Sequence, residues 1–151
     1  MKYFSRKFID GAMSENRRRG AIAAYATHLS KLQLSPALDT LSQLYLHDGL
    51  ILAITHNPRV AVLQLRIRHG DLQVGYADVT LKFSQATIGE KSLQLLRDAV
   101  LPSNVDILAA ELDAKGGCFK YRLLLWPKGE ATLCFKNVMV KSHSVPSRSG
   151  S

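Results

Sequence analysis

The first third of the chain carries its apolar residues at helical spacing. Ser14 predicts an N-cap, and Glu15 suits the positive end of the helix that follows. The next apolar positions fall on one helical stripe, formed by Ile22, Tyr25, Ala26, Leu29 and Leu32. Ser35-Pro36 predicts the start of a second helix, because proline is tolerated in a first turn. The apolar face of this helix is expected to comprise Leu38, Leu41, Leu44 and Tyr45.

Beyond Gly49 the spacing changes to the alternation typical of strands, and about six strands are expected. They cover residues 50–56, 60–69, 72–84, 105–113, 118–126 and 130–141, with a short helix at 90–101. In the third strand Val74 is out of phase with Val79 and Leu81, so Gly75 is the expected site of a β-bulge. The segment His69-Gly70-Asp71 is expected to form the tight turn before this strand.

Length and element order together predict one α+β domain, in which N-terminal helices pack on a mainly antiparallel sheet of about six strands. Residues 1–141 are expected to form it, since a chain of 151 residues can bury a sizeable core. Residues 142–151 are small and polar, and we expect a disordered tail or an expression remnant. No stretch approaches the roughly 18 apolar residues of a membrane helix. The basic N-terminus leaves a transit peptide open, but the acidic Asp10 and Glu15 argue against it, so the expected location is cytoplasmic.

The last predicted hairpin has a defined register if its loop is Pro127-Lys128-Gly129. Trp126 then lies opposite Glu130, and the core side carries the pairs Tyr121–Phe135 and Leu123–Leu133. The other side carries the pairs Lys120–Lys136 and Arg122–Cys134. Directly opposed lysines normally destabilise a sheet, so this basic cluster needs an explanation.

The two cysteines of the chain are expected to be free thiols. The same register places Cys118 opposite Val138, several residues away from Cys134 along the ladder. That separation exceeds the roughly 7 Å between Cα atoms that a disulfide tolerates. Free thiols are consistent with a reducing compartment.

The net charge of +8 indicates attraction to something acidic, such as nucleic acid, an anionic membrane surface or an acidic protein. Arg66 and Arg68 form an outward-facing basic set on the second predicted strand, and Lys82 follows on the third. These residues and the cluster of the last hairpin have two interpretations. They form either a solvated sheet face or a surface that binds an acidic partner.

His47-Asp48 is the dipeptide that most resembles a catalytic or metal-binding pair. A metal-dependent phosphohydrolase needs further ligands on neighbouring helices, and of the remaining histidines only His28 lies on a predicted helix. We therefore favour a structural role at the junction between a helix and a strand. Asp48 can accept backbone N–H bonds there, and His47 can bond a carbonyl or carboxylate.

Other chemical motifs are absent from the sequence. There is no P-loop, dinucleotide fingerprint, nucleophile elbow or C-x-x-C pair, and we expect no catalytic, cofactor-binding or metal-binding residue. Glu111 and Asp113 share one strand face near a turn, which is more typical of a solvent edge than of a site. The segment 15–20, ENRRRG, can contact phosphate, but the aromatic strands of an RNA-recognition motif are missing.

Four segments occur in an order that resembles an uncharacterised bacterial family of small α+β domains. They are MKYFS at Met1, YLHDGLILAI at Tyr45, GDLQVGYADVTLKFS at Gly70 and GCFKYRLLLWPKGEATLCFKNVMV at Gly117. The chain departs from the family pattern at Tyr121, where histidine is common, and at Lys136-Asn137, where an acidic residue often occurs. The resemblance implies no reaction. It implies a likeness to immunity proteins that accompany bacterial polymorphic toxins, and hence protein binding.

The expected function is a non-enzymatic protein-binding domain, an immunity protein that neutralises a cognate toxin by occlusion. Its acidic partner is expected to contact Lys120, Arg122 and Lys136, with Trp126 as an apolar anchor and Arg66 and Arg68 as further contacts. One alternative is a nucleic-acid-binding accessory protein that uses the same basic face. A second is a small hydrolase centred on His47 and Asp48. No cofactor is expected, and the oligomeric state stays open.

Overall fold

The computed structural model describes residues 1–148, and its first three elements are helices. They are α1 (Arg6–Ile9), α2 (Glu15–Ser30) and α3 (Pro36–Gln43). Each helix follows a serine whose side chain accepts a backbone N–H from the first turn, namely Ser5, Ser14 and Ser35. The predicted N-cap at Ser14 and the predicted second helix are therefore confirmed, whereas α1 was not expected.

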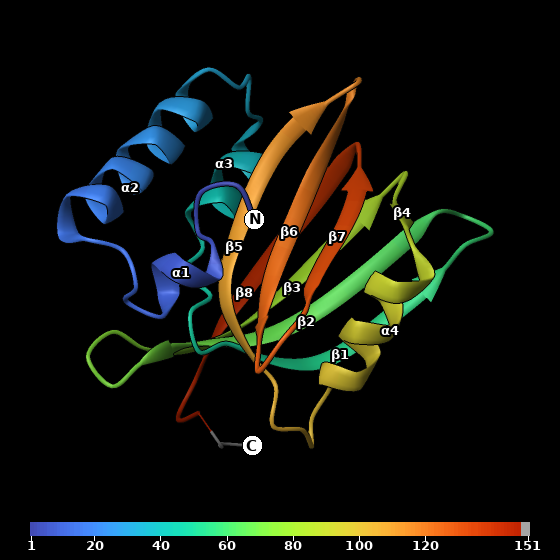
Figure 1. Cartoon of the computed structure of the whole chain (residues 1–151). Coiled ribbons are helices and arrows are strands. Elements are labelled where there is room, and N and C mark those ends of the chain that lie inside the picture. Colours follow the sequence, from blue (N-terminus) through green and yellow to red (C-terminus); the bar gives the residue numbers. More distant parts are fainter. Residues whose placement is uncertain (149–151) are drawn as a thin grey trace.

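Eight strands follow, with one helix among them. The strands are β1 (Leu50–Asn57), β2 (Val62–Asp71), β3 (Gly75–Ser84), β4 (Thr87–Ile88), β5 (Asp106–Lys115), β6 (Cys118–Trp126), β7 (Glu130–Phe135) and β8 (Asn137–Val145). Helix α4 (Glu90–Ala99) lies between β4 and β5. The strands form sheet I, in the order β1-β2-β3-β8, and sheet II, in the order β4-β7-β6-β5. All pairings are antiparallel, which confirms the α+β class (Figure 1).

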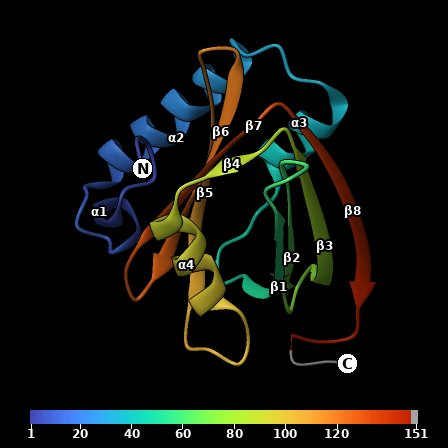
Figure 2. The ribbon, with the colours of Figure 1, turned by 90° about the vertical axis from the view of Figure 1, so that its right-hand side faces the viewer.

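Two sheets form instead of one because the chain changes sheets twice at the same corner. The expected last strand is divided at Lys136, so that β7 pairs in sheet II and β8 in sheet I. Chain segment β3–β4 makes the same change, and the backbone N–H of Lys136 donates to Ser84 O at 3.2 Å. An isolated bridge between Gly49 and Ile107 joins β1 and β5. The two sheets face each other across the core (Figure 2).

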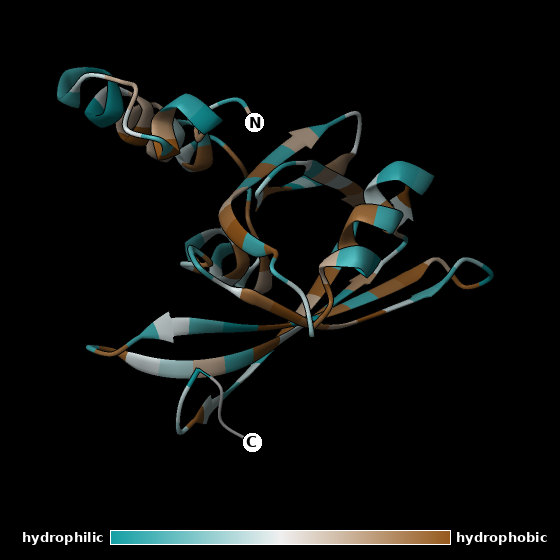
Figure 3. Ribbon diagram, turned by 60° about the horizontal axis from the view of Figure 1, so that its bottom comes forward, coloured by the Kyte–Doolittle hydropathy of each residue, from teal (hydrophilic) through white to brown (hydrophobic). Residues whose placement is uncertain are grey.

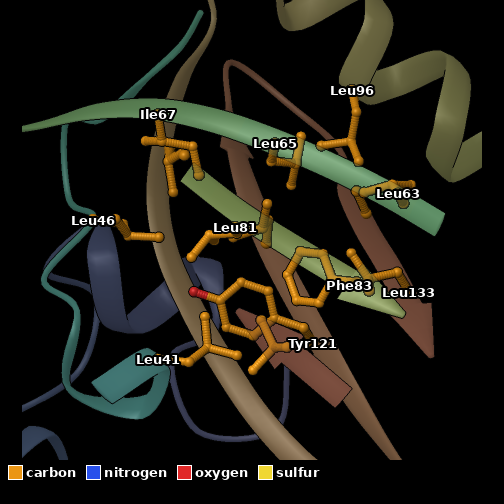
Figure 4. Close-up of a cluster of buried hydrophobic side chains, with 14 of the residues drawn as sticks. Leu41, Leu46, Leu63, Leu65, Ile67, Leu81, Phe83, Leu96, Tyr121 and Leu133 are labelled. Atoms are coloured by element: carbon orange, nitrogen blue, oxygen red, sulfur yellow. The ribbon is translucent and has the colours of Figure 1, made fainter. Parts of the chain in front are cut away.

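The core lies between the sheets. Sheet I contributes buried side chains at alternate positions of β2 and β3, and sheet II contributes those of β6 and β7 (Figure 4). Phe83 is central, with its ring centroid 4.8 Å from that of Phe135 and 6.0 Å from that of Tyr121. Helix α4 contacts β1 and β7, one strand from each sheet, and α3 contacts β8. Both helices therefore cover open edges between the sheets, while α1 and α2 lie beyond sheet II.

The predicted turn before the third strand and the predicted bulge within it are both wrong. Strand β3 begins at Gly75 and pairs with β2 without interruption, and the turn lies at residues 72–74. Asp71 Oδ1 accepts the N–H groups of Gln73 and Val74 at 2.8 Å, which stabilises this turn. Val74 is thus a turn residue, which explains why it was out of phase. The bulges lie instead in β1, between Ile51 and Ala53, and in β5.

The register of the last hairpin differs from the prediction by two positions. Lys120 lies opposite Cys134, and Tyr121 lies opposite Leu133. The N–H of Leu125 donates to Gly129 O at 2.9 Å, so the turn is closed by Leu125 and Gly129 instead of the expected Trp126 and Glu130. Because side chains alternate with a period of two, a shift of two keeps every residue on its predicted face. The expected Lys120–Lys136 pair does not form.

The segment expected to be a disordered tail is partly a strand. Residues 142–145 continue β8, and Ser142 and His143 lie opposite Val79 and Asp78. The outer backbone edge of β3 needs hydrogen-bond partners, and β8 supplies them regardless of its small polar side chains. The rest of the tail prediction, at residues 149–151, lies outside the described residues. Among residues 1–148, no helix is both long and apolar enough to cross a membrane.

Candidate functional site

His47 and Asp48 lie where the chain enters sheet I. Asp48 has a positive φ of 61°, and its N–H donates to Ile107 O at 2.8 Å. His47 Nδ1 lies 2.9 Å from Leu108 O; since a carbonyl only accepts, Nδ1 carries the proton. Both residues therefore connect the loop before β1 to β5. In the described part of the chain, no group of three or more His, Cys, Asp or Glu side chains could hold a metal ion.

Arg122 lies on the outer face of sheet II, where β5 supplies its counter-charges. Its Nη1 is 3.5 Å from Asp113 Oδ2 and 4.0 Å from Glu111 Oε2. Glu111 lies directly opposite Arg122, and Asp113 lies opposite Lys120. Arg122 is thus compensated by acidic residues of the neighbouring strand, whereas no carboxylate among residues 1–148 lies at ion-pair distance from Lys120 or Lys136. The unfavourable pair of directly opposed lysines is avoided, because Lys120 lies opposite Asp113 and Cys134.

Glu111 is buried, with only 1% of its surface exposed, and is not part of a solvent edge. Its carboxylate accepts three backbone N–H groups, from Lys2 at 2.9 Å and from Tyr3 and Phe4 at 2.6 Å. The N-terminal segment therefore folds over this carboxylate. This contact could not be predicted from the local sequence pattern, because residues more than a hundred positions apart form it.

Helix α2 covers the remainder of this charged region. His28 Nε2 lies 3.3 Å from Asp113 Oδ1, and the Tyr25 hydroxyl accepts the N–H of Leu112 at 2.8 Å. Burial alone would raise the pKa of Asp113, but the N–H of Ala114 and the nearby His28 and Arg122 outweigh it and lower that pKa. Burial raises the pKa of Tyr25 to about 12. This side of sheet II is an internal polar network under α2.

The other residues predicted for the hairpin surface are dispersed. Lys120 is half-buried between Asp113 and Cys134, and Lys136 is exposed at the corner between the sheets. Trp126 is 50% exposed at the end of β6, opposite Asp106. Arg66 and Arg68 lie on β2, in sheet I. The predicted site residues therefore do not form one continuous surface.

Sheet I has an outer face that the structure leaves uncovered, which we call the basic face. It comprises Arg66, Arg68, Asp78, Thr80, Lys82, Met139, Lys141 and His143. Thr80 lies between Arg66 and Lys141, directly opposite both, and Lys82 lies beside Met139. All four described helices lie elsewhere, at the open edges between the sheets or beyond sheet II (Figures 2 and 3). Arg66, Lys82, Lys141 and Met139 are exposed.

Asp78 is the one carboxylate on the described strands of this face, and it already forms an ion pair with Arg68. Arg68 donates from Nε to Asp78 Oδ1 at 2.7 Å and from Nη2 to Oδ2 at 2.9 Å. These hydrogen bonds lower the pKa of Asp78 against the opposing effect of burial. Within residues 1–148, no carboxylate lies at ion-pair distance from Arg66, Lys82 or Lys141.

Sequence reasoning did not place Met139 and Lys141 on one face with Arg66 and Lys82, because it kept the last strand in one sheet. A signal was present. The buried positions of β7 are odd-numbered, ending at Phe135, whereas Val138 and Val140 of β8 are even-numbered. Such a change of phase marks a break between strands.

Comparison with known proteins finds no matching family model, curated protein or solved structure. The function must therefore be argued from the chemistry of the basic face.

Proposed function

We propose that the protein is a non-enzymatic binding domain whose basic face docks an acidic surface of a protein partner. The observation that carries this proposal is the group of three exposed cations, Arg66, Lys82 and Lys141, on adjacent strands. Their charges repel one another, and the described chain offers them no carboxylate. An acidic partner would remove that repulsion and complete the charge pairing that Arg68 and Asp78 already show.

The dimensions of the basic face suit a protein interface. Sheet I, whose outer side carries this face, has four strands spaced by about 4.8 Å, and a strand of eight residues rises about 3.3 Å per residue, so the sheet spans roughly 19 by 26 Å. Because side chains protrude from the sheet, its accessible area is larger than this rectangle and approaches the 800 Å² or so that each partner contributes to a standard interface. Met139, which is 51% exposed beside Lys82, supplies an adaptable apolar contact within the cations. Met139 is better placed than Trp126 to act as the anchor.

The shape and composition of the basic face favour a protein over nucleic acid. The major groove of DNA admits a helix or a two-stranded ribbon, and a four-stranded sheet is too broad for it. Single strands need aromatic side chains on which bases stack. None of the residues of the basic face is Phe, Tyr or Trp, and Tyr76, at the edge beside the turn, is half-buried.

The partner we propose is a bacterial toxin, neutralised by occlusion. The resemblance of the chain to immunity-type domains supports this partner class. In such a mechanism the cations accelerate encounter by steering, and the close contacts around Met139 slow dissociation. We also propose a cytoplasmic location, supported by the free thiols of Cys118 and Cys134.

Charge reversal on the two sheets separates this proposal from its alternatives. Partners are captured from the source cells on tagged proteins, with and without nuclease. The tagged proteins are the wild type, Lys82→Glu/Lys141→Glu and Lys120→Glu/Lys136→Glu. Both double variants change the net charge by the same amount. A third, Lys7→Glu/Lys91→Glu, makes the same change of charge at two exposed lysines on α1 and α4. We expect one acidic protein to be lost with Lys82→Glu/Lys141→Glu and kept with the other two.

Purified partner then gives the decisive measurement. Its affinity for Lys82→Glu/Lys141→Glu should fall at least tenfold, mainly through a slower association rate at low salt. An equal loss with all three double variants would indicate a general effect of net charge and contradict the proposal. Retention of a nuclease-sensitive complex would favour nucleic acid instead.

A further inference from the structure

Helix α2 stands away from the body of the protein. Of its 16 residues only Tyr25 is buried, and Ile22 is 53% exposed. The helix lies on the far side of β5 from the core, separated from α3 and from sheet I (Figures 1 and 3). An apolar residue such as Ile22 on a helix normally packs against a neighbouring element. Here the space beside it is hollow.

The hollow is a cavity of about 520 Å³ between α1, α2, the segment after α3 and β5. Its walls are mainly apolar and include Phe4, Phe8, Ile22, Tyr25, Leu44 and Leu108. This volume is within the range of about 300–1,000 Å³ that holds small molecules in proteins.

The walls of the cavity are fixed in place by specific contacts. Tyr25 is fixed by its hydrogen bond from Leu112, and the backbone of Phe4 by its hydrogen bond to Glu111. The ring of Phe4 lies 4.9 Å from that of Tyr25 and 5.2 Å from that of Phe8. These contacts attach α2 to β5 at Tyr25 and fix the aromatic walls of the hollow.

Most polar groups of the lining already have partners within the chain. The Ser42 hydroxyl and the Gln43 amide both donate to Asp39, and His47 Nδ1 donates to Leu108 O. His47 Nε2 lies 3.6 Å from Asp48 Oδ1. These groups leave an apolar interior.

Arg18 is the exception. Its Cζ lies 5.0 Å from the ring centroid of Phe8, at the rim of the cavity. The nearby Glu15 pairs with Arg19 at 3.2 Å, and no carboxylate among residues 1–148 lies at ion-pair distance from Arg18. A guanidinium held over an aromatic ring presents its N–H fork to a carboxylate.

We propose that this cavity binds an amphipathic carboxylate, with its aliphatic chain in the apolar hollow and its carboxylate on Arg18. The site lies on the opposite side of sheet II from the basic face, and it does not depend on the proposed protein partner. The ligand class follows from the lining, which combines one unpaired cation with an otherwise apolar wall.

Decanoate is a suitable probe. The controls are decan-1-ol, which lacks the carboxylate, and acetate, which lacks the long aliphatic chain. Calorimetry below the micellar concentration should give binding of one decanoate per protein and much weaker binding of both controls. Arg18→Gln should weaken decanoate binding about tenfold, whereas Arg17→Gln, on the adjacent exposed position outside the lining, should change it less than twofold. Ile22→Trp should weaken binding by narrowing the cavity at its wall.

Ile22, Arg17 and Arg18 are all exposed, so these variants should fold, and unchanged thermal unfolding checks this directly. Three results would each overturn the proposal. They are no decanoate binding by the wild-type protein, equal losses for Arg17→Gln and Arg18→Gln, and undiminished binding by Ile22→Trp.

Discussion

Arg68 holds Asp78 across β2 and β3 through two parallel hydrogen bonds, of 2.7 and 2.9 Å. Side-chain exposure is 13% for Arg68 and 8% for Asp78, so the pair is largely shielded from water. The pairing neutralises the carboxylate of the basic face and leaves its remaining cations without a described counter-charge. The other formally charged side chains of the basic face, Arg66, Lys82 and Lys141, are all cationic.

Replacing Asp78 by asparagine should destabilise the protein by about 2 kcal/mol at pH 7, the usual value for a hydrogen bond to a charged group. The pKa of Asp78 is lowered in the folded state, so its contribution is present above the unfolded pKa and disappears as pH falls through the folded pKa. The difference between wild type and Asp78→Asn in urea unfolding should therefore shrink below about pH 4. Asp10→Asn, at an exposed position, is the control. A difference that stays constant down to pH 2 would contradict this account.

The sequence predicted the elements well because each depends on local signals. The serine caps, the Pro36 helix start and the alternation of β2, β3 and β6 are properties of neighbouring residues. Division into two sheets is not local, because it depends on how β8 leaves β7 to pair with β3. The phase change after Phe135 was the available signal.

The candidate surface was predicted in part for the same reason. Arg66, Arg68 and Lys82 were expected to point outward together, and they do. The counter-charges of Arg122 in the hairpin, Glu111 and Asp113, were not foreseen, because they come from a strand whose alignment with β6 the sequence did not specify. Charges that are clustered in the sequence are not evidence of an unpaired surface until their cross-strand neighbours are known.

Both cysteines should react with a thiol reagent after denaturation without reductant, giving two thiols per chain. In the native protein, Cys134 should react slowly, because burial raises the pKa of its thiol and reduces the thiolate fraction at neutral pH. Single Cys→Ser variants distinguish the two rates. Loss of both thiols in the denatured wild type would show that a disulfide forms, and faster reaction at Cys134 than at Cys118 would contradict the burial effect.

Tyr25 and Tyr121 should respond oppositely to replacement by phenylalanine. The Tyr25 hydroxyl accepts the N–H of Leu112, so Tyr25→Phe leaves a buried donor unpaired and should cost about 1–2 kcal/mol. The Tyr121 hydroxyl is buried without a hydrogen-bond partner in the described structure, so Tyr121→Phe should be neutral or stabilising by up to about 1 kcal/mol. Chemical denaturation of both variants tests this, and equal destabilisation would contradict it.

Glu111 should be the most sensitive carboxylate in the protein. Glutamine keeps the shape of the side chain but offers one acceptor oxygen, while three backbone N–H groups at Lys2, Tyr3 and Phe4 point at this position. Glu111→Gln should therefore cost about 3 kcal/mol and release the N-terminal segment, seen as faster hydrogen exchange at the amides of Tyr3 and Phe4.

Glu90→Gln, at the exposed start of α4, is the matched control and should cost only a few tenths of a kcal/mol through the helix dipole. Because Arg122 also lies at 4.0 Å from Glu111, the double variant Glu111→Gln/Arg122→Gln separates charge from hydrogen bonding. If the N–H groups dominate, the second substitution restores little stability. Recovery to within about 0.5 kcal/mol of the wild type would assign the effect to the ion pair instead.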